Sequence, residues 1–102
     1  MGLLNFLFDN KKSNVQDFLK RDALILDVRT KTEWDAGHIE NAIHIPLADL
    51  KMKIGELKEY DRPFVVYCES GGRSGKAVDY LTQNNFEAIN GGGYKGLSKI
   101  IG

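Results

Sequence analysis

Short runs of hydrophobic residues recur along the chain, separated by segments in which apolar and polar residues alternate at helical spacing. Two of these runs, Ala23–Val28 and Phe64–Tyr67, are continuous, which predicts strands buried on both faces, as in a parallel sheet. Shorter runs at 42–45 and 86–89 predict two further strands, and Pro46 closes the first of them. The hydrophobic pattern therefore predicts four strands.

Between these runs, apolar residues repeat every three or four positions, which predicts amphipathic helices. The predicted helices cover residues 15–20, 46–60, 74–83 and 94–101. Ser13 or Asn14 can cap the first helix, because their side chains accept hydrogen bonds from unpaired backbone N–H groups. The glycine run Gly91–Gly93 is predicted to be a turn between the last strand and the last helix.

A fifth, shorter helix is predicted around Glu33 and Trp34. Thr30 or Thr32 can cap its first turn, and Gly37 ends it, since glycine adopts the left-handed backbone conformation that stops a helix. We expect Trp34 to be a core residue.

Strands that alternate with helices predict an α/β fold in which helices cover both faces of a mostly parallel sheet. The chain has 102 residues, which is the size of one domain. Residues 1–12, with the apolar stretch Leu3–Phe8, are predicted to be an arm or a short helix lying on a domain formed by residues 13–102. The arm lacks the basic leader and the cleavage site of a signal peptide, so we expect a cytoplasmic location.

Composition narrows the classes of function. The chain has 14 Lys and Arg against 14 Asp and Glu, so no overall field predicts binding to nucleic acid or insertion into a membrane. One cysteine excludes an internal disulfide and a four-cysteine zinc site, and two histidines are too few to rebuild one. No apolar run approaches the ~20 residues that span a bilayer.

The candidate chemistry follows the strand at 64–67. Cys68 stands where ligands bind in parallel α/β sheets, beyond the carboxyl end of a strand. Gly71 and Gly72 allow successive backbone N–H groups to turn toward one point, and the helix predicted from Ser74 adds its unpaired N–H groups there. Such surroundings favour a cysteine thiolate, whose pKa lies well below the ordinary ~8.5 near helix N-termini. The alternative interpretation is a buried, inert cysteine.

Arg73 has two candidate roles, because its guanidinium group can brace the loop through hydrogen bonds or offer positive charge to an anionic sulfur donor. Lys76 lies one turn into the helix, and the simplest interpretation is a solvated surface lysine. Four residues separate Cys68 from Arg73. A cysteine phosphatase loop has one residue more, which makes room for a tetrahedral oxyanion.

Three segments of the chain, taken in order, form a specific set of motifs. The first comprises Leu26-Asp-Val-Arg29, Glu33-Trp34, Gly37-His-Ile39 and Ala42-Ile-His-Ile-Pro46. The second is Tyr67-Cys-Glu-Ser-Gly-Gly-Arg-Ser74, and the third is Asn90-Gly-Gly-Gly-Tyr94. Together they resemble the signatures of rhodanese-like domains. The resemblance covers about residues 13–101 and implies a three-layer fold, in which helices flank a mostly parallel five-stranded sheet.

The resemblance also implies roles for individual residues. Cys68 is implied to carry sulfane sulfur as a persulfide, cradled by the backbone N–H groups of Glu69, Ser70, Gly71, Gly72 and Arg73. Asp27, Arg29 and Ser74 are implied to support this loop.

For several neighbouring polar residues a structural role competes with a catalytic one. For Asp27 and Arg29 we favour hydrogen bonds that fasten loops over contact with substrate. Glu33 is expected to pair with Arg29 or to cap a helix. His38 is expected to be structural rather than a general base, and His44 to be packed or at the surface.

The resulting hypothesis is a sulfurtransferase that exchanges sulfur in two steps. Its partners are expected to be small sulfur donors such as thiosulfate or polysulfide, or a protein persulfide, and a small acceptor or a protein thiol. No metal and no organic cofactor is implied. The alternatives are a non-enzymatic relay or regulatory module and, with less support from the loop length, a phosphatase or arsenate reductase. The negative charge of Glu69 is expected to disfavour highly charged anionic donors.

Overall fold

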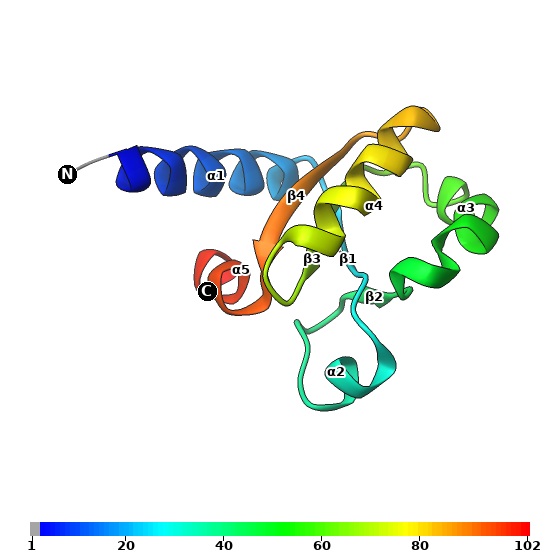
Figure 1. Cartoon of the computed structure of the whole chain (residues 1–102). Helices are drawn as coiled ribbons and strands as arrows, with labels where there is room; N and C mark the ends of the chain where they lie inside the picture. Colours follow the sequence, from blue (N-terminus) through cyan, green and yellow to red (C-terminus); the bar gives the residue numbers. More distant parts are fainter. Residues whose placement is uncertain (1–2) are drawn as a thin grey trace.

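A computed structural model describes the backbone of residues 3–102 and the side chains from Asn10 onward. Strands and helices alternate along it as the hydrophobic pattern predicts (Figure 1). In chain order the elements are α1 (Leu3–Lys20), β1 (Leu24–Asp27), α2 (Lys31–Asp35), β2 (Ile43–His44), the 3-10 turn η1 (Leu47–Asp49), α3 (Leu50–Lys58), β3 (Phe64–Cys68), α4 (Gly72–Gln83), β4 (Ala88–Gly93) and α5 (Tyr94–Ile101).

The sheet is parallel throughout and has the strand order β2-β1-β3-β4. Asp27 at the end of β1 lies in register with His44 of β2 and Tyr67 of β3. Within the described residues the sheet has four strands. The five strands implied by the family resemblance are therefore corrected to four. The physical reason is that each of the four apolar runs forms one strand, while the remaining apolar residues occur at helical spacing.

Helices cover both faces of the sheet, which confirms the predicted layered α/β fold. Helices α3 and α4 pack on one face through Leu50, Leu57, Ala77 and Leu81. Helices α1 and α5 pack on the other face through Val15, Leu97 and Ile100. Figure 1 shows α1 and α5 on one side of β3 and β4, with α3 and α4 on the other.

Strand β3 forms the centre of the core. All five of its residues are buried, and their side chains alternate between the two faces. Val66 and Cys68 belong to the cluster under α3 and α4, whereas Val65 and Tyr67 belong to the cluster under α1 and α5. The alternation of a strand therefore decides that the Cys68 side chain points toward α4.

Helix α1 joins two separately predicted segments, the arm or short helix of residues 1–12 and the helix from residue 15. It is continuous from Leu3 to Lys20, so Ser13 and Asn14 lie inside a helix and an N-cap there is wrong. No glycine or proline interrupts residues 3–20, which explains the continuity. The first two residues of the predicted arm lie outside the described residues, and the division of the chain at residue 12 stays a prediction.

Strand β4 is longer than predicted. It continues through Gly93, so the predicted turn at Gly91–Gly93 is wrong. A β-bulge keeps the strand paired, because Asn90 lies opposite Val66 while Gly92 lies opposite Tyr67. A side chain at Gly91 would come within 2.8 Å of Val65 Cγ1, so only glycine fits the extra position.

The remaining differences concern helix boundaries. The segment predicted as one helix from Pro46 begins with the η1 turn, and α3 starts only at Leu50. Helix α4 begins at Gly72, two residues before the predicted start. No helix over the described residues has the length and hydropathy needed to cross a bilayer.

Candidate active site

Cys68 is the last residue of β3, and a short loop joins it to α4 at the carboxyl edge of the sheet (Figure 1). Gly71 ends this loop with a φ of 101° and is the N-cap of α4. This left-handed conformation favours glycine because a Cβ atom there meets the backbone. The tight entry directs the first N–H groups of α4 back toward the end of β3.

The sulfur of Cys68 is surrounded by hydrogen-bond donors. The backbone N–H of Gly71 donates to Sγ at 3.0 Å, and the Ser74 hydroxyl lies 3.3 Å from Sγ. Burial raises the pKa of the thiol, but hydrogen bonds from the Ser74 hydroxyl and from the N–H groups of Ser74, Ser70 and Gly71 lower the pKa by more. The net effect is a lowered pKa, which favours a thiolate.

Cys68 is also enclosed. The residue is 1% exposed and packs in the same cluster as Val66 and Ala77. The sulfur therefore lies between apolar side chains on one side and the Gly71 N–H and Ser74 hydroxyl on the other.

Asn90 joins the sulfur site from β4, although the sequence analysis did not select it. Its Oδ1 accepts hydrogen bonds from the Ser74 hydroxyl at 2.7 Å and from the Gly92 N–H at 2.9 Å. Its Nδ2 donates to the carbonyl oxygen of Gly71 at 3.0 Å. The sequence places Asn90 directly before the glycine run, but the predicted turn there concealed the strand that brings it to α4.

Arg29 is a buried structural centre beside the loop. Its guanidinium group donates to Asp27 at 2.8 Å, to the Gly37 carbonyl at 2.7 Å and to Glu69 at 3.1 Å. It also lies over the ring of Tyr94, with 4.5 Å between the guanidinium carbon and the ring centroid.

The pKa of Arg29 follows from these contacts. Burial lowers it, but the bonds to Asp27 and Glu69 raise it more strongly, so the group is positively charged. These contacts fasten three segments of the chain together, which is the role we favoured for Asp27 and Arg29.

Arg73 makes a two-pronged ion pair with α2. Its two terminal nitrogens donate to the carboxylate oxygens of Glu33 at 2.7 and 2.9 Å. Glu33 also forms a capping box with Thr30. The hydrogen bond from Arg73 and the backbone N–H of Thr30 lower the pKa of Glu33 to about 2. The predicted pairing of Glu33 with Arg29 is wrong, whereas the predicted helix cap is confirmed.

The two histidines flank Trp34. The His38 ring stacks on the indole with 3.5 Å between centroids, and the His44 ring stacks at 4.6 Å. His38 Nδ1 lies 3.0 Å from the Trp34 carbonyl oxygen, and His44 Nε2 lies 2.8 Å from the Arg29 carbonyl oxygen. These contacts agree with the structural role expected for His38, and His44 is packed, as one of its two expected placements. Trp34 is half-buried between them, so the expected core position is wrong.

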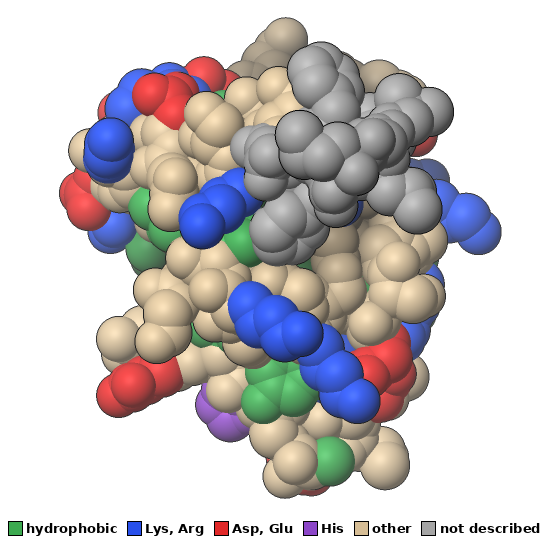
Figure 2. All heavy atoms as spheres, turned by 90° about the vertical axis from the view of Figure 1, so that its left-hand side faces the viewer, with side chains coloured by type: hydrophobic (Ala, Val, Ile, Leu, Met, Phe, Trp, Pro, Cys, Tyr) green, Lys and Arg blue, Asp and Glu red, His purple; other side chains and the backbone are tan. Residues whose placement is uncertain are grey.

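Positive and negative side chains both occur around the loop that follows Cys68, and those that the structure describes form no patch of one sign. Arg29 and Arg73 are both paired, Glu69 has a side chain that is 48% exposed, and Lys76 is exposed on α4. Figure 2 shows basic and acidic side chains interspersed on the face of the molecule that it presents. Over the part of the chain that the structure describes, no three His, Cys, Asp or Glu side chains converge as metal ligands would.

Comparisons with known proteins agree with this geometry. The family model described as the rhodanese-like domain matches residues 11–99. The chain is 39% identical over 77 residues to protein YqhL of Bacillus subtilis (strain 168), and the match covers 74% of this chain and 60% of that protein. It is 36% identical over 73 residues to the tRNA uridine(34) hydroxylase of Cronobacter sakazakii, covering 67% of this chain and 21% of that one.

A similar solved structure is that of a rhodanese-related protein from Thermoplasma volcanium. It has a TM-score of 0.72 and 30% identity, and the match covers 86% of this chain and 87% of that one. The likeness therefore extends over nearly the whole of both chains. By contrast, the chain spans less than two thirds of the two relatives named above.

Proposed function

Because the chain belongs to the rhodanese-like domain family, we propose that it is a sulfurtransferase that carries sulfane sulfur as a persulfide on Cys68. The observation that carries the proposal is the set of donors around Sγ, with the Gly71 N–H at 3.0 Å and the Ser74 hydroxyl at 3.3 Å. Donors arranged in advance stabilise negative charge on sulfur without reorganising during the reaction.

In the first step the Cys68 thiolate attacks the outer sulfur atom of the donor. A new sulfur–sulfur bond forms on Cys68, and the bond between that atom and the rest of the donor breaks. The leaving group departs with the electron pair, as sulfite when the donor is thiosulfate. The enzyme then holds a persulfide whose terminal sulfur is anionic.

In the second step a thiophilic acceptor, written as a thiolate, attacks that terminal sulfur. The bond to Sγ breaks and Cys68 leaves as a thiolate, so atoms and electrons balance without an added oxidant or reductant. The donors around Sγ thus serve twice, since they stabilise the nucleophile of one step and the leaving group of the other.

The backbone N–H groups of the loop have the closest role. We assign the first-turn N–H groups of α4, from Gly72, Arg73 and Ser74, to the terminal sulfur of the persulfide, together with those of Glu69, Ser70 and Gly71. Both nearby arginines are already paired, so backbone amides rather than a free cation hold the anion. Asp27 and Arg29 act by keeping the loop in place.

Donor and acceptor are proposed only as classes, namely thiosulfate, polysulfide or a protein persulfide as donor, and a small thiol, cyanide or a protein thiol as acceptor. The name of one relative records a tRNA uridine hydroxylase, but the match covers 21% of that protein.

Intact-protein mass measurement tests the proposal. After incubation with thiosulfate or polysulfide, the protein should gain the mass of a sulfur atom, and a reductant should remove it. The chain has one cysteine, so Cys68→Ser is a clean control that should gain nothing. Equal gain in the variant, or none in the wild type with either donor, would contradict the proposal.

A further inference from the structure

Asn90 contacts both residues whose polar groups lie against the sulfur. It reaches the Ser74 hydroxyl through Oδ1 and the Gly71 carbonyl through Nδ2, while the N–H of Gly71 donates to Sγ. One side chain from β4 therefore holds the loop and the first turn of α4, the two segments that surround Cys68. Figure 1 shows β4 beside the start of α4.

The β-bulge places Asn90 in this position. Register slips between Asn90 and Gly92, and the Gly92 N–H donates to Asn90 Oδ1 at 2.9 Å. Because the extra residue is a glycine packed against Val65 and Leu97, the bulge cannot be filled by another side chain without displacing the core. The bulge in β4 therefore fixes the position of the Asn90 side chain.

The Ser74 hydroxyl faces two acceptors but has a single proton. It lies 2.7 Å from Asn90 Oδ1 and 3.3 Å from Sγ, and the residue is 0% exposed, so water does not supply a third partner. When Cys68 is a thiol, S–H can donate to Ser74 Oγ and the hydroxyl to Asn90. When Cys68 is a thiolate, sulfur cannot donate, and the hydroxyl stabilises it only by turning toward Sγ.

When the Ser74 hydroxyl turns from Asn90 to Sγ, every buried polar group still keeps at least one hydrogen bond. Asn90 Oδ1 keeps the Gly92 N–H, and Nδ2 keeps the Gly71 carbonyl. Both arrangements are therefore fully hydrogen-bonded, which is the condition for a buried polar network to have two accessible states.

We propose that Asn90 is a positioning residue of the sulfur site. Its amide oxygen accepts the hydrogen bond of the Ser74 hydroxyl while Cys68 is a thiol, and the hydroxyl redirects that bond to Sγ when Cys68 becomes a thiolate, its proton staying on Ser74 Oγ. The catalytic consequence rests on the proposed sulfurtransferase function, but the hydrogen-bond exchange does not. Competition from Asn90 limits how far Ser74 stabilises the thiolate. That limit keeps the sulfur nucleophilic, because nucleophilicity falls as thiol pKa falls.

Charged groups around the sulfur come from each neighbouring segment. They are Asp27 at the end of β1, Arg29 just after it, Glu33 on α2, Glu69 in the loop, Arg73 and Lys76 on α4, and Lys11 of α1 beside Gly92. The same groups are present in every variant, so variants at position 90 are compared against one electrostatic background.

The rate of alkylation by iodoacetamide as a function of pH measures the pKa of Cys68 directly, since the chain has no other cysteine. Asn90→Asp keeps an acceptor but makes it anionic, so it should hold the Ser74 proton more firmly and raise the pKa by about one unit. Asn84→Asp is the matched control. Asn84 Nδ2 also donates to a backbone carbonyl, that of Tyr80 at 2.8 Å, but at the far end of α4, and its variant should leave the pKa unchanged.

The Ser74→Ala background separates the effect of the hydrogen-bond exchange on the Cys68 pKa from the effect of the charge that Asn90→Asp adds. If the exchange operates, Asn90→Asp should raise the pKa by less than half as much in the Ser74→Ala background as in the wild type. Should Asn90→Asp fail to fold, Asn90→Ala tests the same point. Without the competing acceptor, Ser74→Ala should raise the pKa by more in the Asn90→Ala background than in the wild type.

The proposal would be overturned if Asn90→Asp shifted the pKa of Cys68 equally in the wild type and in the Ser74→Ala background. Asn90 would then act only through Gly71 or through its charge. No shift beyond that of Asn84→Asp would overturn it as well. Alkylation needs no sulfur transfer, so this outcome is separate from failure of the proposed function. Thermal unfolding of each variant shows whether the native fold is retained.

Discussion

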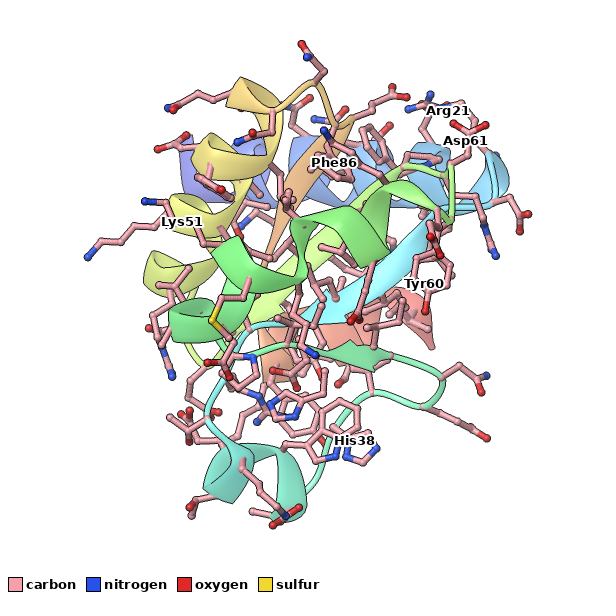
Figure 3. The ribbon with its side chains drawn as sticks, turned by 90° about the vertical axis from the view of Figure 1, so that its right-hand side faces the viewer. Arg21, His38, Lys51, Tyr60, Asp61 and Phe86 are labelled. Carbon is pink, nitrogen blue, oxygen red and sulfur yellow. The ribbon has the colours of Figure 1, made fainter. Side chains whose placement is uncertain are left out.

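The two ends of the sheet contain similar ion pairs in different surroundings. At the carboxyl end, the side chains of Arg29 and Asp27 are 2% and 0% exposed. At the amino end, Arg21 and Glu87 form a pair of similar length whose side chains are 43% and 56% exposed. Figure 3 shows Arg21, Asp61 and Phe86 gathered at the amino end, while His38 lies at the opposite side of the molecule.

The difference in burial between the two ion pairs shows at which end of the sheet the side chains are held in fixed positions. An exposed pair contributes about 0–1 kcal/mol and tolerates movement, whereas a buried pair fixes its partners because breaking it leaves an uncompensated charge. Arg29 has such a role, since it joins β1, the segment at Gly37 and the Cys68 loop through Glu69. The carboxyl end is therefore held rigid around the sulfur.

A cavity alone does not identify the functional end. A hollow of about 410 Å³ lies at the amino end, lined in part by Leu57, Asn84 and Phe86. It contains no cysteine and no converging donors like those around Cys68. The proposed chemistry therefore depends on where donors converge rather than on where space is available.

The largest contrast between the ends is expected from Arg29→Met. Removing the guanidinium group leaves Asp27 buried and unpaired, which should lower the free energy of unfolding by about 3–5 kcal/mol. Arg21→Met at the amino end should lower it by about 1 kcal/mol or less. Urea denaturation of both variants measures the difference, and equal losses would show that the two ends do not differ as described. Asp27→Asn combined with Arg29→Met should recover part of the loss.

A smaller effect is expected from Glu33→Gln. The folded protein lowers the pKa of Glu33 to about 2 from an ordinary value of 4.5, so its contribution to stability is present above 4.5 and is lost as pH falls toward 2. At pH 7 the variant should be less stable by about 1 kcal/mol, and the difference should narrow as pH falls from about 4.5 toward 2.

Denaturation curves across this range test the assignment. A difference between wild type and Glu33→Gln that does not change with pH would place the acid-sensitive group elsewhere. Glu87→Gln, at the amino end, is the matched control for loss of an exposed carboxylate.

The smallest effect is expected from Glu69→Gln. Removing one negative charge at the rim of the loop should raise kcat/KM for thiosulfate, a dianion, by about three- to tenfold. The gain should shrink as ionic strength rises, because salt screens exposed charges. Steady-state kinetics of the folded variant checks this, and an unchanged or lower kcat/KM would show that rim charge does not select the donor.

Local features of the site were predictable from the sequence. The run Phe64–Tyr67 and the following Gly71 and Gly72 place Cys68 at a strand end before a helix, because strand periodicity and glycine conformation act over a few residues. The Thr30–Glu33 capping box is equally local. Layering, parallel pairing and the positions of the four strands follow from the same short-range patterns.

Only the tertiary structure decided which charged groups pair. Arg29 bonds to Glu69 and Arg73 bonds to Glu33, and each pair is separated by 40 residues. In the sequence either carboxylate could pair with either arginine. In the fold, Glu69 lies within reach of Arg29 and Glu33 within reach of Arg73. Asn90 reaches Ser74 for the same reason, because the bulge in β4 depends on packing against Val65 and Leu97, which belong to other elements of the fold.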